Sequence, residues 1–105
     1  MMVTPIPKTP RVSDRKTFER CKSETCEVDG SPTYGIGPHH IITRGASGPD
    51  IPENLIQLCW TCHYVKIPAG KYSQDFLFGV VGRRLRKSGE ECRKAVRRAM
   101  GYAVT

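Results

Sequence analysis

Five cysteines and three histidines are the residues of this chain best suited to metal chemistry. Four of the cysteines form two short-spaced pairs, Cys21-x4-Cys26 and Cys59-x2-Cys62. Two such turns can point four thiolates at one ion, which is the tetrahedral arrangement that zinc prefers. A disulfide framework is the alternative, and the odd cysteine count, the tight spacing and the lack of a signal peptide disfavour it. We therefore predict a structural zinc ion bound by Cys21, Cys26, Cys59 and Cys62.

All three histidines lie close to these cysteines along the chain. His39 and His40 are adjacent, and His63 directly follows Cys62. Imidazole binds metals and also titrates near neutral pH, so this grouping favours a second metal site or acid–base chemistry over isolated structural histidines. The fifth cysteine, Cys92, falls on the apolar stripe of a predicted helix and is expected to be a buried, unliganded thiol.

The elements that must position these residues are short. Strands are predicted over residues 40–43 and 55–58, and the turn-forming run at 44–50 between them predicts a hairpin with a long loop. A helix is predicted over residues 60–66, with Trp60 in the core rather than on a base-stacking surface. The expected order is strand, strand, helix.

Further helices flank this unit. Ser13 is expected to cap a helix that runs to Arg20, and Ser73 a helix that runs to about residue 87. Ser88 and Glu91 predict a capping box for a last helix. The Pro-rich start suggests a flexible arm over residues 1–13, followed by a single domain over 14–105 with a core motif at 21–66 and a basic helical segment at 72–101.

Residues 38–66 resemble the HNH endonuclease family. The pattern consists of a histidine pair, a Gly-rich loop, an Asn-Leu step and a closing Cys-x2-Cys-His, present here as His39-His40, residues 44–50, Asn54-Leu55 and Cys59-Trp60-Thr61-Cys62-His63. The upstream Cys21-x4-Cys26 is similar to the zinc-stapled, phage- and restriction-type branch. The resemblance implies a small α+β fold, a ββα-metal (His-Me finger) motif with a structural zinc site and appended basic helices.

The resemblance also implies roles for individual residues. His40 would be the general base that takes a proton from the attacking water, and His39 and His63 would bind one divalent ion at the scissile phosphate. Asn54 would hydrogen-bond across the long loop and hold the base in register. The family's further metal-binding histidine is replaced by Ile67, and two protein ligands suit Mg²⁺ or Mn²⁺ better than a tightly held Zn²⁺. Two adjacent histidines can serve one site only if the strand begins or bends there.

Charge points to a polyanionic partner. The formal net charge is +7, and the whole excess lies in residues 66–105. The predicted partner is DNA, although a solvated basic face would look the same. The candidate DNA-binding residues are Arg44, Lys66, Arg83, Arg84, Arg93 and Arg97. The longest apolar run, at residues 76–81, is too short to cross a bilayer, so we expect a soluble, cytoplasmic protein without a membrane partner.

These observations together predict a metal-dependent DNA endonuclease that leaves 5′-phosphate and 3′-hydroxyl ends. The family suggests a phage packaging or restriction setting, with partners of those systems. One alternative is a zinc-containing nucleic-acid-binding module without catalysis, and another is a structural zinc protein that binds protein partners.

Overall fold

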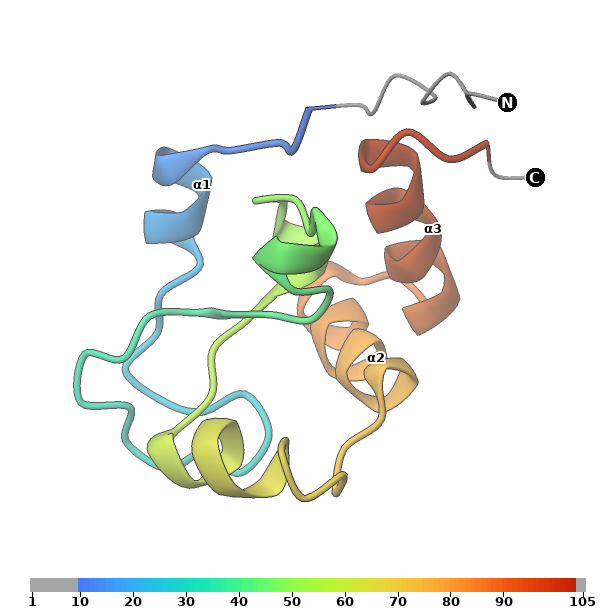
Figure 1. The fold of residues 1–105 in the computed structure, drawn as a ribbon. Coiled ribbons are helices and arrows are strands. Elements are labelled where there is room, and N and C mark those ends of the chain that lie inside the picture. Colours follow the sequence, from blue (N-terminus) through green and yellow to red (C-terminus); the bar gives the residue numbers. More distant parts are fainter. Residues whose placement is uncertain (1–9, 104–105) are drawn as a thin grey trace, which may run out of the picture.

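The computed structural model describes residues 10–103, and most of the predicted N-terminal arm lies outside this range. Two α-helices pack together at the C-terminal end, and a shorter helix lies on the other side of a small hairpin (Figure 1). The elements in chain order are α1 (Arg15–Arg20), β1 (His39–His40), η1 (Arg44–Ala46), η2 (Pro52–Asn54), β2 (Leu55–Ile56), η3 (Cys62–Lys66), α2 (Gln74–Leu85) and α3 (Gly89–Ala99).

The predicted hairpin is present, with much shorter strands than expected. β1 pairs with β2 in antiparallel register, His39 opposite Ile56 and His40 opposite Leu55. Beyond this pair the side chain of Asn54 replaces the ladder, since its Oδ1 accepts a hydrogen bond from the backbone N–H of Ile42 at 2.8 Å. The strands stop where this side chain takes over the backbone hydrogen bonds.

The helix ends follow the capping rules, with one correction. Ser73 caps α2 and accepts from the backbone N–H of Phe76, and Ser88 and Glu91 form the predicted capping box of α3. The cap of α1 is Asp14 rather than Ser13, because the extended Asp14 accepts from the backbone N–H of Thr17. The positive N-terminal end of the helix dipole also stabilises a carboxylate at this position.

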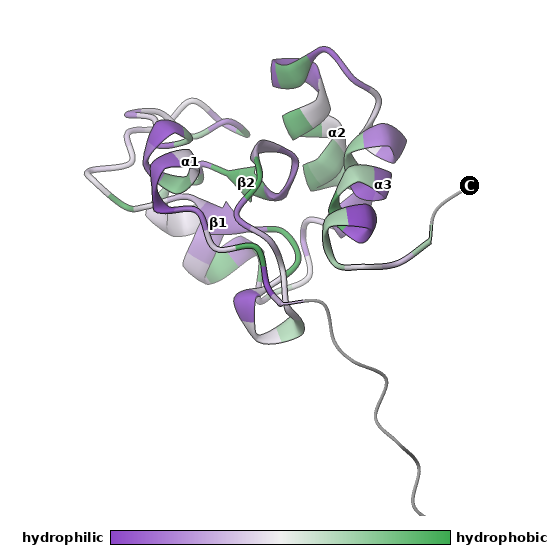
Figure 2. Cartoon of the chain, turned by 90° about the horizontal axis from the view of Figure 1, so that it is seen from above, coloured by the Kyte–Doolittle hydropathy of each residue, from purple (hydrophilic) through white to green (hydrophobic). Residues whose placement is uncertain are grey.

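The core lies between the hairpin and the two C-terminal helices. Figure 2 shows β2 in hydrophobic colours and β1 in hydrophilic ones, which matches a buried Leu-Ile strand beside the His-His strand. α2 and α3 approach closely because glycines line their junction: a Cβ on Gly82 would lie 2.5 Å from the carbonyl oxygen of Lys87. The core residues are Ile41, Ile56, Leu58, Leu77, Phe78, Val80, Val81 and Val96, together with Cys26, Cys59, Cys62 and Cys92.

Two predictions about single side chains have opposite outcomes. Cys92 is fully buried in the core, as expected of a structural thiol. Trp60 was expected to be buried, and this prediction is wrong: it is 59% exposed. It lies in the turn that leads into η3, where its ring is next to that of Tyr64 with 5.6 Å between centroids. Among the described residues, no helix is long and apolar enough to cross a membrane.

Candidate functional site

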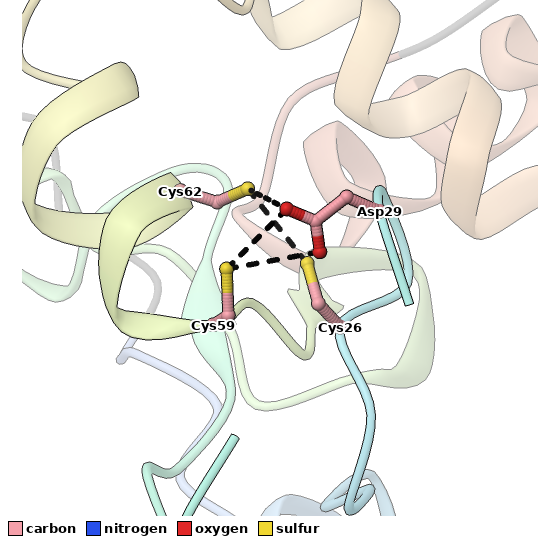
Figure 3. A group of neighbouring side chains, drawn as sticks. All are labelled: Cys26, Asp29, Cys59 and Cys62. Carbon is pink, nitrogen blue, oxygen red and sulfur yellow. Dashed lines mark hydrogen bonds between the residues drawn. The ribbon is translucent and has the colours of Figure 1, made fainter. Parts of the chain in front are cut away.

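Three cysteines and one aspartate form a compact cluster at the start of η3 (Figure 3). The potential ligand atoms of Cys26, Asp29, Cys59 and Cys62 all lie within 4.8 Å of one another. The Sγ atoms of Cys26 and Cys62 are 3.8 Å apart, and Oδ2 of Asp29 lies 3.4 Å from Sγ of Cys62 and 3.6 Å from Sγ of Cys59. Ligands tetrahedrally arranged around zinc would give about 3.8 Å between sulfurs and about 3.5 Å from sulfur to oxygen. The donor set and its spacing fit a zinc ion.

The cluster differs from the predicted ligand set in one position. Cys21 lies outside it, half-buried at the C-terminal cap of α1, and Asp29 is the fourth member instead. Cys26-x2-Asp29 repeats the spacing of Cys59-x2-Cys62, so each pair comes from one tight turn. In the first turn the backbone N–H of Gly30 donates to the carbonyl of Cys26 at 2.9 Å, and Gly30 has a φ of +75°. The repeated spacing was the signal in the sequence for Asp29.

The pKa values of the carboxylate and of one thiol in the cluster are shifted in opposite directions. Hydrogen bonds from the backbone and side chain of Ser31 hold the pKa of Asp29 well below its usual range. Burial raises the pKa of Cys62 to about 12. A divalent cation would be needed to deprotonate such a thiol at neutral pH, and its binding would release protons.

His39 and His63 form a second pair beside the hairpin. Their rings meet edge to face with centroids 4.7 Å apart. Burial lowers the pKa of both imidazoles, and in His39 the charges of His63 and His40 add to the effect and bring the pKa to about 4. Nδ1 of His63 is buried and has no hydrogen-bond partner within residues 10–103. Two neutral imidazoles, one with an unpartnered nitrogen, fit a site for a divalent metal ion.

His40 is the second residue of β1, directly after His39, and is 8% exposed. Its Nε2 lies 2.7 Å from Oδ1 of Asp50, a buried carboxylate that also accepts from Nη1 of Arg11 at 2.8 Å and the backbone N–H of Asp14 at 2.9 Å. Burial alone would raise the pKa of Asp50, but the hydrogen bonds from Arg11 and His40 outweigh it and lower the pKa. The phenyl ring of Phe18 stacks on the imidazole at 5.7 Å between centroids. The imidazole is thus fixed between a charged carboxylate and an aromatic face.

Asn54 spans the loop between β1 and β2 from a fully buried position. Its Nδ2 donates to the carbonyl oxygens of Ile42 at 3.0 Å and Pro49 at 3.1 Å, so one side chain holds both ends of the loop. Gly48 makes this closure possible, because a Cβ there would lie 1.7 Å from the carbonyl oxygen of Ile42. The loop that carries Asp50 is therefore fixed from within.

A family model described as HNH endonuclease matches residues 19–66. This segment is similar to an HNH domain. No curated protein and no solved structure matches the chain. The matched segment contains the histidines, Asn54 and the cysteine cluster, and its β1–β2 hairpin followed by η3 is the ββα-metal arrangement. An HNH domain indicates a nuclease or nucleic-acid-related function.

The six predicted DNA-binding residues are spread around the matched segment and the two helices that follow it. The guanidinium of Arg44 lies over Phe18 at 5.4 Å, next to His40. Lys66 lies 5.9 Å from the ring of Tyr72, Arg93 donates to Glu90 at 3.0 Å, and Arg97 lies 4.7 Å from the ring of Tyr102. Arg83 is exposed on α2. Their contact with DNA stays a prediction.

Arg84 has a structural position within this set. It pairs with Glu27, and its Nη2 donates to the carbonyl oxygens of Pro52 at 2.8 Å and Leu55 at 3.0 Å. The guanidinium thus joins α2 to the segment that enters β2. Of the predicted DNA-binding residues, Arg84 is the one whose donors are most fully engaged inside the fold.

Sequence reasoning missed the residues that hold His40. Asp50 is ten residues away along the chain, and Arg11 and Phe18 precede the HNH pattern altogether. Nothing in local spacing marks them, because their contacts form only when α1 folds back onto the loop. The segment before α1 takes part in this contact, since the backbone N–H of Asp50 donates to the carbonyl of Val12 at 2.8 Å.

Proposed function

We propose that this chain is a metal-dependent DNA endonuclease that hydrolyses phosphodiester bonds. The observation that carries the proposal is the joint arrangement on β1: a carboxylate-bound imidazole, His40, adjoins an edge-to-face imidazole pair, His39 and His63. One part suits proton transfer and the other suits a divalent ion, which are the two requirements of phosphodiester hydrolysis at neutral pH.

His40 is the general base in this proposal. Asp50 accepts the Nε2–H, fixes that tautomer and leaves the lone pair on Nδ1 to take a proton from the attacking water. The carboxylate then stabilises the imidazolium that forms. Arg11 is a positioning residue, because its Nη1 bridges Asp50 and the carbonyl oxygen of Gly48 at 3.1 Å and so ties the carboxylate to the loop.

His39 and His63 would hold the catalytic ion, for which Mg²⁺ and Mn²⁺ are the candidates. When bound, such an ion supplies charge stabilisation at the scissile phosphate and at the leaving 3′ oxygen. The two imidazoles are held neutral by burial, so their lone pairs are available without a proton to displace. The expected products carry 5′-phosphate and 3′-hydroxyl ends.

Cys26, Asp29, Cys59 and Cys62 would hold a structural zinc ion. The site connects the turn at residues 26–29 to the start of η3, which carries His63. A small core gains much of its stability from such a site, because ligand binding supplies folding free energy directly. Zinc binding would therefore hold His63 opposite His39, while taking no part in proton transfer.

Cleavage of supercoiled plasmid by the wild type and by His40→Ala tests the proposal. The wild type should nick or linearise the plasmid with added Mg²⁺ or Mn²⁺ and lose activity in EDTA, and readdition of the metal should restore it. His40→Ala should bind DNA and retain its zinc, measured by elemental analysis, yet lose cleavage. Asp50→Asn should lower kcat with little change in KM, since the carboxylate acts through His40.

Two outcomes would overturn parts of this proposal. Near wild-type cleavage by His40→Ala would remove His40 from the chemistry. DNA binding by the folded, zinc-loaded wild type without cleavage in any divalent metal would favour the nucleic-acid-binding module without catalysis. Circular dichroism that shows a folded His40→Ala is the control for the expected loss of cleavage.

A further inference from the structure

A small pocket of about 160 Å³ lies beside two residues that contact the proposed base, Phe18 and Asp50. Its lining residues are Arg11, Ser13, Arg15, Phe18, Arg44 and Asp50. Two of them contact His40: Asp50 through its carboxylate and Phe18 through ring stacking. The pocket and the imidazole therefore share two walls, although His40 itself does not line the pocket.

The pocket has an excess of positive charge. It is lined by three guanidinium groups and one carboxylate, and that carboxylate is already engaged by His40, Arg11 and the backbone of Asp14. Arg15 is 89% exposed and reaches a single carboxylate, Glu19, at 3.9 Å. Within residues 10–103, Arg44 has no ion-pair partner, and its guanidinium rests on Phe18. Two of the arginines that line the pocket thus have little to neutralise their charge.

The size and chemistry of the pocket fit one phosphodiester group. Its volume of about 160 Å³ is several times the roughly 30 Å³ that one water occupies in the liquid, so the pocket has room for a group larger than a single water, such as a phosphate. Guanidinium groups match phosphate oxygens in a two-pronged geometry, and the hydroxyl of Ser13 adds a neutral donor. The ring of Phe18 offers an apolar face for the adjoining sugar.

We propose that this arginine pocket binds a backbone phosphate of the DNA that neighbours the scissile one and so fixes the strand against His40. The inference rests on the proposed function, since it assigns the pocket to the same substrate. Arg15 and Arg44 contact a single phosphate together, while Arg11 holds the wall of the pocket through Asp50. Only Arg44 among these residues was a candidate from the sequence.

Duplex binding against salt concentration, measured by fluorescence anisotropy, tests this inference. The variants are Arg15→Ala, Arg44→Ala and both together, in a His63→Ala background without Mg²⁺ or Mn²⁺ so that the DNA stays intact. His63 does not line the pocket. The matched control is Lys16→Ala with Arg20→Ala, which removes two exposed positive charges from the same helix outside the pocket.

If two arginines contact one phosphate, the effects of their removal can be predicted. The double variant should bind about tenfold more weakly than its background. The log-log salt slope should fall by about 0.9, which corresponds to one phosphate, and the losses of the single variants should not add. The control pair should change affinity much less.

Three results would overturn the pocket. They are an unchanged salt slope in the double variant, an affinity loss no larger than that of the control pair, and additive losses with a slope change of about 1.8, the value for two independent phosphates. Because the assay measures binding alone, it is separate from the test of catalysis. A protein that binds as predicted and never cleaves would refute the endonuclease proposal and keep the phosphate site.

Discussion

Replacement of Asn54 by alanine should destabilise the protein far more than its single side chain suggests. Asn54 is fully buried and makes three hydrogen bonds: it accepts from the backbone N–H of Ile42 and donates to the carbonyl oxygens of Ile42 and Pro49. A buried hydrogen bond contributes about 1 kcal/mol net, so the loss should be about 3 kcal/mol. That is a large part of the 5–15 kcal/mol typical of a whole domain.

Urea denaturation of the zinc-loaded protein measures this loss. With an m-value of about 1–3 kcal/mol/M for a small domain, the midpoint should fall by about 1–3 M. Asn54→Asp should be no better than alanine, because a carboxylate oxygen would face two carbonyl oxygens with no proton between them. Gln74→Ala is the matched control: it removes an exposed amide from the first turn of α2 and should shift the midpoint by less than about 0.3 M.

Asn54→Ala should also lose activity. The hydrogen bonds of Asn54 fix the loop that ends at Asp50, so the variant should lose cleavage even without urea, at temperatures at which it remains folded. A midpoint shift below about 0.5 M would refute the view that this side chain closes the loop. A folded Asn54→Ala variant with wild-type kcat would refute its role in positioning His40.

Three further predictions follow from the same contacts. Asp29→Ala should lower the zinc content and thermal stability of the purified protein, whereas Asp29→Cys should keep one zinc per chain. Equal zinc content in Asp29→Ala and the wild type would exclude Asp29 as a ligand. A large loss of zinc in Cys21→Ser would support the ligand set first predicted. Gly48→Ala should cost about 1–3 kcal/mol in urea denaturation, because its Cβ would collide with the carbonyl oxygen of Ile42. Arg84→Ala should lower the free energy of unfolding by about 2 kcal/mol, since Arg84 joins α2 to Pro52, Leu55 and Glu27. The control Arg83→Ala should change it by no more than about 0.5 kcal/mol. Similar losses in the two variants would contradict a structural role for Arg84.

Local features of this fold could be predicted from the sequence because short-range rules determine them. The capping box at Ser88 and Glu91, the cap at Ser73 and the pairing of two strands around a long loop all depend on residues a few positions apart. The three cysteines of the cluster and the position of Asn54 follow in the same way from the HNH pattern. Each of these signals is a short motif that can be recognised by itself, although the paired strands and the two halves of the cluster are distant in the chain.

The remaining features are not decided by the motif residues alone. Cys21 and Asp29 are each a few residues from Cys26, and only the turn closed by Gly30 decides which of them faces Cys59 and Cys62. Trp60 has the composition of a core residue, yet it is exposed in the turn that leads into η3. The hydrogen bond between Asp50 and His40 likewise depends on contacts with α1, the helix before the motif.

The position of that helix bears on how much of the chain the catalytic unit needs. The HNH match begins at residue 19, whereas Arg11, Asp14 and Phe18, which hold Asp50 and stack on His40, all precede it. The cluster of Cys26, Asp29, Cys59 and Cys62 includes none of these residues. The two imidazoles of β1 therefore have different neighbours: His39 meets His63, which directly follows Cys62, whereas His40 contacts Asp50 and Phe18. If His40 is the base, a segment limited to residues 19–66 would keep Asp50, its direct partner, and would lack Arg11, Asp14 and Phe18, which hold that carboxylate and stack on the imidazole.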